Sequence, residues 1–378
     1  MKSLREMGMM KVDQPMVSVA MVTRNVERYL EEAIESVLSQ SFRDLEFIIV
    51  DFGSTDRTRG IIQSYAHRDE RVLYQEIPEC SVAFARNAAC QLARGEYIAI
   101  QDADDISLPH RIACEVAFLR SHPQAGLVGS EIQRIDESGM PLKTVNDLPT
   151  EDAEIRRELA TWNPFWQPTV LFRRDAFVEA GGYRNLYPSE DYDLWLRIAE
   201  KHACANLHDI LLHYRIHSNQ VSVRRRKEQI LRALAARASV SLRREKKADP
   251  LDAGIEPTPA VLEQMGVSLQ KQQEAIIEGY AFWVKQLYGS EEYVSVELAA
   301  TELARECQGR EAERPLVADA LLLASKAEWK QGRIASSVRF LCRGACLNPR
   351  ILARPLRRLL RRGHPTLSNN PDVKQMQT

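Results

Sequence analysis

Short apolar runs alternate with helix-forming segments along the N-terminal half of this 378-residue chain. Residues 17–22, 47–50 and 97–100 are each long and apolar enough for one buried strand, and residues 72–74 are a weaker candidate. Between the first two runs, apolar residues over 30–38 recur at the spacing of one helix face. This alternation predicts an α/β fold with a mainly parallel sheet flanked by helices.

Polar residues follow the predicted strands at the point where each one ends. Thr23 and Asn25 follow the first strand, Asp51 follows the second, and residues 102–105 follow the last. Because ligands bind at the carboxyl ends of the strands in such sheets, we expect these residues to share one site. Strand ends are also where polar turns occur, so the pattern alone fits a set of solvated turns equally well.

Asp102, Asp104 and Asp105 lie within four positions, and they repel one another at neutral pH unless a cation or hydrogen-bond donors relieve them. Mg²⁺ and Mn²⁺ suit such oxygen ligands and commonly bind through one or two carboxylates plus substrate phosphates. The cluster therefore predicts a divalent metal that neutralises a departing diphosphate, with a solvated acidic turn as the alternative. Neither a GxxxxGKS/T nor a GxGxxG motif is present, which argues against a P-loop ATPase or kinase and against a dinucleotide oxidoreductase.

Charge and cysteine content argue against further classes of protein. The formal net charge of −1, with no basic excess in the N-terminal half, argues against a nucleic-acid partner. The seven cysteines are scattered and form no CxxC pair, so we expect free thiols in a reducing cytosol rather than a zinc site. Neither a signal peptide nor an apolar run of membrane-spanning length is visible, so a cytoplasmic enzyme is expected.

Five motifs occur in one order between about residues 15 and 222. They read VSVAMVTRN, IIVDFGSTD, ARNAAC, GEYIAIQDADD and SEDYDLWLR. This ordered set resembles the family 2 glycosyltransferases, which have the GT-A fold. The resemblance implies an enzyme that moves a sugar, with inversion, from a nucleoside-diphosphate sugar to a hydroxyl group of a glycan or lipid-linked acceptor. Such enzymes take part in the assembly of surface polysaccharides or glycolipids.

The resemblance assigns the donor side of the site. Asp102 and Asp104 look like the family's DxD motif, which holds the metal and the donor diphosphate, and Asp104 is the best candidate for a direct metal contact. Asp51 matches an acidic position near the nucleoside base. Arg86 matches an arginine near the donor nucleotide, where a guanidinium suits a phosphate or a base edge. The expected donor-binding residues are Thr23, Asn25, Asp51, Arg86 and Asp102.

The same resemblance assigns the acceptor side and a further metal ligand. Glu190 and Asp191 resemble the family's acidic pair, and Asp191 is expected to be the general base that takes the proton of the acceptor hydroxyl. Both acids also open a predicted helix, whose dipole favours carboxylates there. Trp195 falls where the family packs an aromatic near the acceptor, although a core tryptophan fits equally. His217 matches a histidine that reaches the diphosphate or the metal, although a lone histidine also fits a structural role.

One position departs from the family pattern. The family usually has two acids before the Gly-Ser pair, and here the second of them is Phe52. That second acid often recognises the base of a uridine donor, whereas a phenylalanine accepts no hydrogen bond and instead stacks on a base or packs into the wall. Phe52 therefore puts the usual contact with uridine in doubt. It does not affect the assignment of the metal ligands or of Asp191 as the general base.

The C-terminal region has a different pattern, because strand signals end near residue 224. We expect a catalytic domain over residues 1–223, a helix and linker over 224–260, and a helical region with a basic tail over 261–378. Alanine-rich segments around Gly332 weakly resemble a tetratricopeptide-type helical pair. So few repeats favour a small helical appendage over a solenoid.

The tail from Arg339 onward is basic and carries one acid, Asp372. Its cations are interleaved with leucines, as in an amphipathic helix that lies on an anionic membrane surface. A peripheral contact with the inner face of the membrane is therefore expected, with a solvated helix face or a protein contact as the alternatives. The cations are Arg339, Arg343, Arg350, Arg354, Arg357, Arg358, Arg361, Arg362 and Lys374.

Two other functions fit parts of the sequence. A sugar nucleotidyltransferase also uses a nucleotide site and metal carboxylates, but residues 23–25 lack the glycine-rich loop expected after its first strand. A catalytically degenerate nucleotide- or sugar-binding protein of the same fold would explain Phe52. It would have no need of both the acidic cluster and the pair formed by Glu190 and Asp191.

Overall fold

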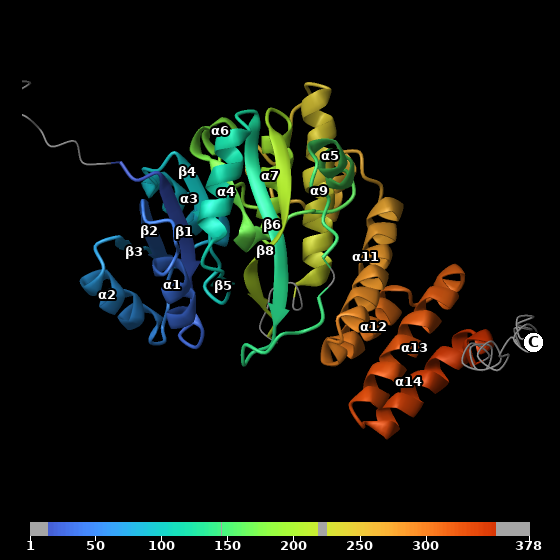
Figure 1. The fold of residues 1–378 in the computed structure, drawn as a ribbon. Coiled ribbons are helices and arrows are strands. Elements are labelled where there is room, and N and C mark those ends of the chain that lie inside the picture. Colours follow the sequence, from blue (N-terminus) through green and yellow to red (C-terminus); the bar gives the residue numbers. More distant parts are fainter. Residues whose placement is uncertain (1–13, 145, 218–224, 353–378) are drawn as a thin grey trace, which may run out of the picture. The chain divides into compact units, whose positions relative to one another are not determined.

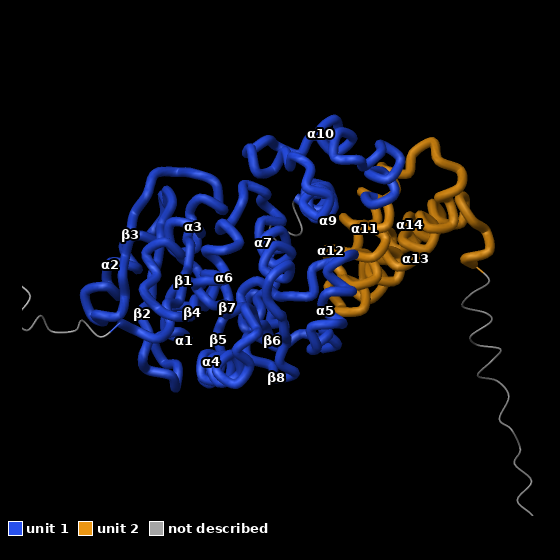
Figure 2. The backbone as a smooth tube through the Cα atoms, turned by 90° about the horizontal axis from the view of Figure 1, so that it is seen from above, with its two compact units in different colours: residues 1–276 blue, residues 277–378 orange. Residues whose placement is uncertain are grey.

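The computed structural model describes residues 14–144, 146–217 and 225–352. The chain forms two compact units, residues 1–276 and residues 277–378 (Figure 2). All strands of the described residues belong to the first unit, and the second unit is helical (Figure 1). The fold class predicted from the sequence, an α/β part followed by a helical region, is confirmed.

A mixed sheet of eight strands, counted over the described residues, forms the centre of the first unit (Figure 1). The strands are β1 (Val17–Thr23), β2 (Leu45–Asp51), β3 (Val72–Glu76), β4 (Tyr97–Ile100), β5 (Ile106–Ser107), β6 (Ala125–Ile135), β7 (Leu171–Arg173) and β8 (Ala203–Arg215). They lie in the order β3-β2-β1-β4-β7-β6-β8-β5. Among them, β5 and β7 run antiparallel to their neighbours and the other pairs are parallel, so the sheet is mainly parallel, as predicted.

Two strands of the parallel half, β1 and β2, are buried on both faces. Every residue of β2 is buried, and in β1 Val22 alone is partly exposed. Strands of this kind need helices on both faces of the sheet. Their register places Thr23 beside Asp51 and Ala20 beside Ile100, so the polar residues that follow β1, β2 and β4 meet at one edge.

Helices cover both faces of this sheet (Figure 1). Val19 and Met21 of β1 face a core that includes α1 (Leu30–Leu38), α2 (Thr58–Arg68) and α4 (Arg111–Ser121). Ala20, which points to the opposite face, belongs to a second core. The helices of that second core include α3 (Val82–Leu92), α5 (Asp152–Leu159), α6 (Arg174–Glu179) and α7 (Glu190–Ala199).

The second half of the sheet differs from the sequence prediction. Residues 167–172 form a 3-10 turn over Gln167–Thr169 followed by β7, because Pro168 lacks the N–H that a strand ladder needs. The strands β6 and β8, which the sequence did not indicate, pair over most of their lengths although both mix apolar with polar residues. The end of β8 brings His217 to the edge where the parallel strands end.

The helix and linker predicted over 224–260 belong to the first unit. Ala235 and Ala236 of α9 (Arg226–Arg244) are fully buried in the core that contains α7. Leu251 and Leu262, the latter in α10 (Pro259–Gln264), join the same core. The compact unit therefore extends to residue 276, because these segments bury their apolar residues against the α/β part.

The second unit is a small set of packed helices. It contains most of α11 (Leu269–Gly289) and all of α12 (Tyr293–Glu306), α13 (Arg314–Lys330) and α14 (Ile334–Leu347), together with 3-10 turns at Glu311–Glu313 and Pro349–Leu352. Gly332 joins α13 to α14 with a φ of +75°, as in the helical pair expected there. The helices pack closely, since a Cβ at Gly344 would lie 3.2 Å from the carbonyl oxygen of Ala318.

The described ranges contain no helix with the length and apolar character that a membrane crossing requires. Of the predicted basic tail, Arg339, Arg343 and Arg350 lie in or beside α14 with exposed side chains. The cations from Arg354 onward lie outside the described residues. All seven cysteines are free thiols, as predicted.

Candidate active site

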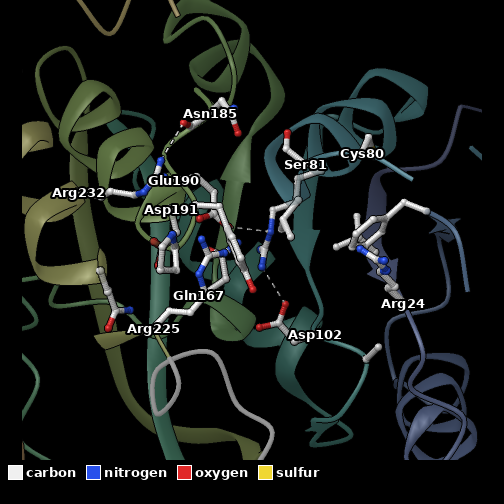
Figure 3. A pocket seen from close by; sticks show the side chains of 18 of the residues that line it. Arg24, Cys80, Ser81, Asp102, Gln167, Asn185, Glu190, Asp191, Arg225 and Arg232 are labelled. Carbon is white, nitrogen blue, oxygen red and sulfur yellow. Dashed lines mark hydrogen bonds and ion pairs between the residues drawn. The ribbon is translucent and has the colours of Figure 1, made fainter. Parts of the chain in front are cut away.

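A cavity of about 740 Å³ opens where the parallel strands end (Figure 3). Its wall is built from the loops after β1, β2 and β4, from α3, from the start of α7, from the end of β8 and from the region of α9. The chemistry-bearing side chains that line it are Arg24, Arg86, Asp102, Asp104, Tyr187, Glu190, Asp191, Tyr214, His217, Arg225, Gln229, Arg232 and Glu256.

Two of the three acids after β4 line this cavity. His217 Nε2 lies 2.8 Å from Asp104 Oδ2, so the histidine that follows β8 meets the loop that follows β4. Asp102 lies on the same wall, where burial raises the pKa of its carboxyl, Arg86 opposes that rise, and Asp104 and Asp191 add to it. Of the residues at the strand ends that were expected to share one site, Asp102 and Asp104 line the cavity.

The third acid, Asp105, holds the loop instead of lining the cavity. Its side chain is buried, and its Oδ1 accepts a 2.8 Å hydrogen bond from the backbone N–H of Arg215. Arg215 Nε donates in turn to the backbone carbonyl of Asp104 at 2.9 Å. Burial and the neighbouring charges of Asp104 and Asp102 raise the pKa of Asp105 well above its usual value. Asp105 therefore fixes the position of the two acids before it.

Arg86 lies between two acidic parts of the cavity wall, one with Asp102 and the other with Glu190. From α3, its Nη2 lies 3.4 Å from Asp102 Oδ1 and its Nε lies 3.4 Å from Glu190 Oε1 (Figure 3). Burial disfavours the charged guanidinium, but the charges of Asp102 and Glu190 outweigh it and raise the pKa of Arg86 above its usual value. A permanently charged arginine with spare N–H groups in such a cleft can bind a phosphate.

Glu190 and Asp191 begin α7, where the helix dipole favours negative charge. Burial raises the pKa of each carboxyl above its usual value, and Arg86 opposes the rise in both. Asn163 Nδ2 donates to Asp191 Oδ2 at 3.0 Å, which orients that carboxylate. A partly desolvated carboxylate with a raised pKa is suited to accept a proton near neutral pH.

The side chains of Asp102, Asp104 and His217 fit a divalent metal of the Mg²⁺ or Mn²⁺ type. Asp102, Asp104 and His217 supply oxygen and nitrogen donors on one side of the cavity. Within the part of the chain that the structure describes, no three His, Cys, Asp or Glu side chains already converge as a complete metal centre. That arrangement agrees with an ion that takes one or two protein carboxylates and completes its coordination with substrate phosphates and water.

Three predicted donor residues do not line the cavity: Asp51 and Thr23 are buried, and Asn25 is exposed outside it. Asp51 is fully buried and accepts a 3.3 Å hydrogen bond from the backbone N–H of Ser54. Thr23 is buried beside it, and Asn25 Oδ1 accepts from the backbone N–H of Thr55 at 2.8 Å. These side chains therefore shape the loops that hold Arg24 and Phe52, which do line the cavity.

Phe52 lines the cavity and is also part of the core. It is 6% exposed and packs in the cluster that contains Ala83 and Ile100. Of the two roles considered for this residue, packing into the wall is what the structure shows.

The acceptor-side assignment of Trp195 is corrected. Its side chain is fully buried, and its ring packs between those of Phe165, Phe172 and Tyr183 at centroid distances of 5.9 to 6.5 Å. It does not line the cavity. The alternative of a core tryptophan is confirmed, because the residues of α7 from Tyr192 to Ala199 are buried all round the helix.

Several cavity residues gave no signal in the sequence. Tyr187 precedes α7, while Gln229, Arg232 and Glu256 come from α9 and the turn beyond it, a region that the sequence placed outside the catalytic domain. Arg232 donates to Glu256 at 2.8 Å, and both side chains line the cavity. Side chains brought together over such sequence distances leave no local motif.

Comparisons with known proteins agree with this picture. The family model described as glycosyl transferase family 2 matches residues 18–180. The chain is 38% identical over 193 residues to the putative glycosyltransferase EpsE of Bacillus subtilis, covering 50% of this chain and 68% of that protein. It is 32% identical over 209 residues to the O-antigen biosynthesis glycosyltransferase WbnJ of Escherichia coli, covering 54% of this chain and 80% of that protein.

Solved structures show the same fold at lower identity. A crystal structure of S. aureus TarS, residues 1–349, with UDP-GlcNAc has a TM-score of 0.52 and 18% identity, with 84% of this chain and 92% of that chain covered. The mannosyltransferase PcManGT of Pyrobaculum calidifontis, with GDP-Man and Mn²⁺, has a TM-score of 0.51 and 19% identity, with 89% and 88% covered. The family model and the relatives establish that the chain is a glycosyltransferase of family 2, and the solved structures show that it has the GT-A fold.

Proposed function

We propose that this glycosyltransferase moves a sugar, with inversion, from a nucleoside-diphosphate donor to an acceptor hydroxyl, and that Asp191 is the general base. The observation that carries this proposal is the position of Arg86. It stands 3.4 Å from Asp102 on the wall that fits a metal and a diphosphate, and 3.4 Å from Glu190 on the wall that fits a base. One cavity thus holds both halves of an inverting displacement.

The leaving diphosphate belongs on the wall of Asp102, Asp104 and His217. A divalent metal bound there with the donor would neutralise charge on the departing diphosphate. Arg86 faces the same side and, being permanently charged, binds a phosphate oxygen, while its charge opposes the rise in the pKa of Asp102. His217, in contact with Asp104, orients that carboxylate or joins it as a ligand.

The acceptor belongs on the wall of Glu190 and Asp191. Asp191 accepts the proton of the acceptor hydroxyl as that oxygen attacks the anomeric carbon from the face opposite the diphosphate. Asn163 orients the Asp191 carboxylate through the 3.0 Å hydrogen bond, and Glu190, which contacts Arg86, keeps the arginine in place between the walls. Inversion follows because attack and departure occur on opposite faces in one step.

The biological setting follows from the relatives. WbnJ is described as an O-antigen biosynthesis enzyme, so we assign this chain to the assembly of a surface polysaccharide or glycolipid, on a glycan or lipid-linked acceptor. Arg339 and Arg343 are exposed on α14, and no acid occurs between Ile334 and Arg350. This charge supports a peripheral contact between the C-terminal region and an anionic membrane surface.

A thermal-shift screen tests the donor half of the proposal. UDP-GlcNAc and GDP-mannose, the donors bound by the two solved structures, are offered with and without Mn²⁺. A rise in melting temperature for one of them that requires Mn²⁺ is the expected result. If neither donor shifts the melting temperature while the folded protein is intact, the donor assignment fails and a degenerate binding protein becomes the better account.

A further inference from the structure

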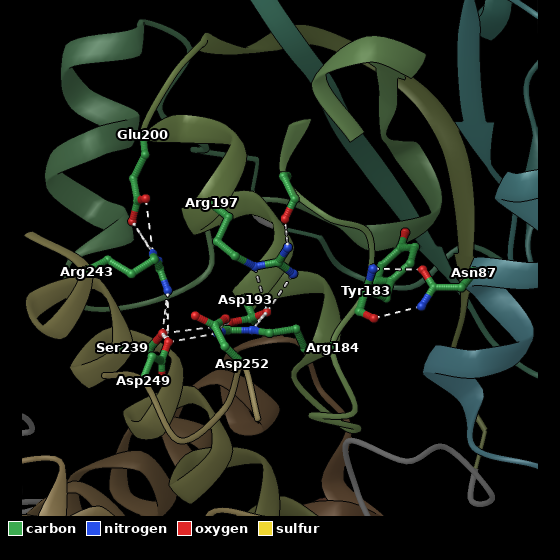
Figure 4. Close-up of polar contacts among 11 residues, drawn as sticks. Asn87, Tyr183, Arg184, Asp193, Arg197, Glu200, Ser239, Arg243, Asp249 and Asp252 are labelled. Atoms are coloured by element: carbon green, nitrogen blue, oxygen red, sulfur yellow. Dashed lines mark hydrogen bonds and ion pairs between the residues drawn. The ribbon is translucent and has the colours of Figure 1, made fainter. Parts of the chain in front are cut away.

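A buried network of charged side chains surrounds the first turns of α7 without lining the cavity (Figure 4). We call it the α7 anchor, and it consists of Arg184, Asp193, Arg197, Ser239, Arg243 and Asp249. It ties α7 to α9 and to the turn beyond α9, two segments that follow the region matched by the family model.

Arg184 is the centre of the α7 anchor. Its Nε donates to Asp193 Oδ2 at 2.9 Å, and its Nη2 donates to the other oxygen of the same carboxylate. Its Nη1 donates to Asp249 Oδ2 at 2.8 Å and to Asp252 Oδ1 at 2.8 Å. Its Nη2 also donates to Ser239 Oγ at 2.9 Å. One guanidinium therefore joins α7, α9 and the turn that follows α9 (Figure 4).

The two carboxylates of the anchor are buried, and each is paired with arginines. The side chains of Asp193 and Asp249 are 0% and 1% exposed, whereas that of Asp252 is 63% exposed. Burial disfavours the ionised form of Asp193, but the charges of Arg197 and Arg184 outweigh it and lower the pKa of that carboxyl. Buried charges that are paired in this way hold a single geometry, because a shift of one partner leaves the other without compensation.

The chain just before Arg184 is fixed from the opposite side. Asn87, next to Arg86 on α3, donates to the carbonyl oxygen of Tyr183 at 2.7 Å and accepts from its N–H at 2.8 Å. Gly182 has a φ of +73°, and a Cβ there would lie 2.8 Å from Asn87 Oδ1. The segment that leads into α7 is thus held between the helix of Arg86 and the α7 anchor.

We propose that Arg184 is a positioning residue that holds the two carboxylates at the start of α7 in register with Arg86, and that α9 and the buried Asp249 therefore belong to the catalytic unit. This inference rests on the proposed role of Asp191. Asp191 and Asp193 lie on the same first turn of α7, so a displacement of the anchored Asp193 moves Asp191 within the cavity. A misplacement of about 1 Å is enough to cost about 100-fold in rate.

The test compares R184K with D252N. Lysine keeps the positive charge but cannot donate to both carboxylate oxygens of Asp193 as the guanidinium of Arg184 does. D252N changes one contact of the same guanidinium, with an exposed carboxylate. With the donor selected by the Mn²⁺ screen, release of nucleoside diphosphate is expected to show a kcat about 10- to 100-fold lower in R184K and a KM that stays within about twofold. D252N is expected to match the wild type.

A second readout does not depend on turnover. The groups that face Asp191 are Glu190, Arg86 from α3, Asp102 after β4 and Asn163. If R184K loosens the start of α7, water reaches the Asp191 carboxyl and its pKa falls from its raised value. Carboxyl ¹³C NMR, with the resonance assigned by its loss in D191N, measures this change in the free protein.

Each outcome decides the inference. A folded R184K with wild-type kcat and a wild-type pKa for Asp191 would overturn it. If R184K does not fold, S239A replaces it, because that variant removes one partner of Arg184 at little steric cost. S239A is expected to lower kcat and the pKa of Asp191, each by less than R184K. Full activity of D191N would refute the proposed function alone, since the NMR comparison still tests whether Arg184 positions the start of α7.

Discussion

Arg86 is the residue whose replacement tests the electrostatics of the site most sharply. It lies 3.4 Å from both Asp102 and Glu190, and its side chain is 13% exposed. At an effective dielectric constant of about 20, two unit charges at that separation attract by about 5 kcal/mol before the cost of desolvation. Since removal of one partner of a buried charge pair typically costs about 3–5 kcal/mol, R86Q is expected to lower the free energy of unfolding by about that amount near neutral pH.

The cost of R86Q is expected to depend on pH in a defined direction. Without Arg86, the pKa of Asp102 and that of Glu190 rise further above their values in the unfolded chain. A carboxyl whose pKa is raised in the folded state stabilises the fold fully below its unfolded pKa, and this contribution is lost as pH rises through the folded pKa. The deficit of R86Q relative to the wild type should therefore be largest at about pH 8 and shrink toward about pH 5.

Equilibrium urea unfolding at a series of pH values measures this deficit. R24Q is the matched control, because Arg24 also lines the cavity and pairs with Glu79 at 2.6 Å, but with side chains 39% and 67% exposed. That pair is expected to contribute no more than about 1 kcal/mol. The reasoning is refuted if R86Q costs no more than R24Q at about pH 8, or if its deficit grows as the pH is lowered.

Three further predictions concern other parts of the molecule. D104N is expected to weaken Mn²⁺ binding at least about tenfold in calorimetric titrations, and unchanged affinity would remove Asp104 from the metal site. G182A is expected to lower the free energy of unfolding by about 1–3 kcal/mol, because it forces a side chain into a left-handed backbone against Asn87, and a neutral effect would contradict this. R339E/R343E is expected to weaken flotation with phosphatidylglycerol vesicles by at least about 25-fold, at about 1 kcal/mol per cation, and wild-type flotation would exclude α14 from the membrane contact.

The parts of the fold that could be predicted from the sequence are those with local signals. The strands β1, β2 and β4 are continuous apolar runs, each followed by polar residues, and their parallel pairing brings Asp102 and Asp104 to the edge where Arg86 lies. His217 lies at the same edge, in contact with Asp104. It was predicted from the family resemblance, since the strand pattern did not indicate β8.

The parts that could not be predicted depend on distant partners. β6 and β8 carry polar residues between their apolar ones, and only their pairing with each other makes them strands. Trp195 was left open between the acceptor side and the core because α7 is buried all round, so its apolar residues do not define one face. Arg184 meets partners 9 to 68 positions away, and no pattern near residue 184 indicates them.

The general-base assignment of Asp191 is the central claim, and a comparison of D191N with D252N tests it most directly. Both variants replace an aspartate by its isosteric amide, but Asp252 is exposed and lies outside the cavity. With the donor selected by the screen, D191N is expected to lower turnover by about 100- to 10,000-fold and to keep the Mn²⁺-dependent rise in melting temperature on donor binding. D252N is expected to retain both properties. Wild-type turnover in D191N, with donor binding intact, would contradict the account.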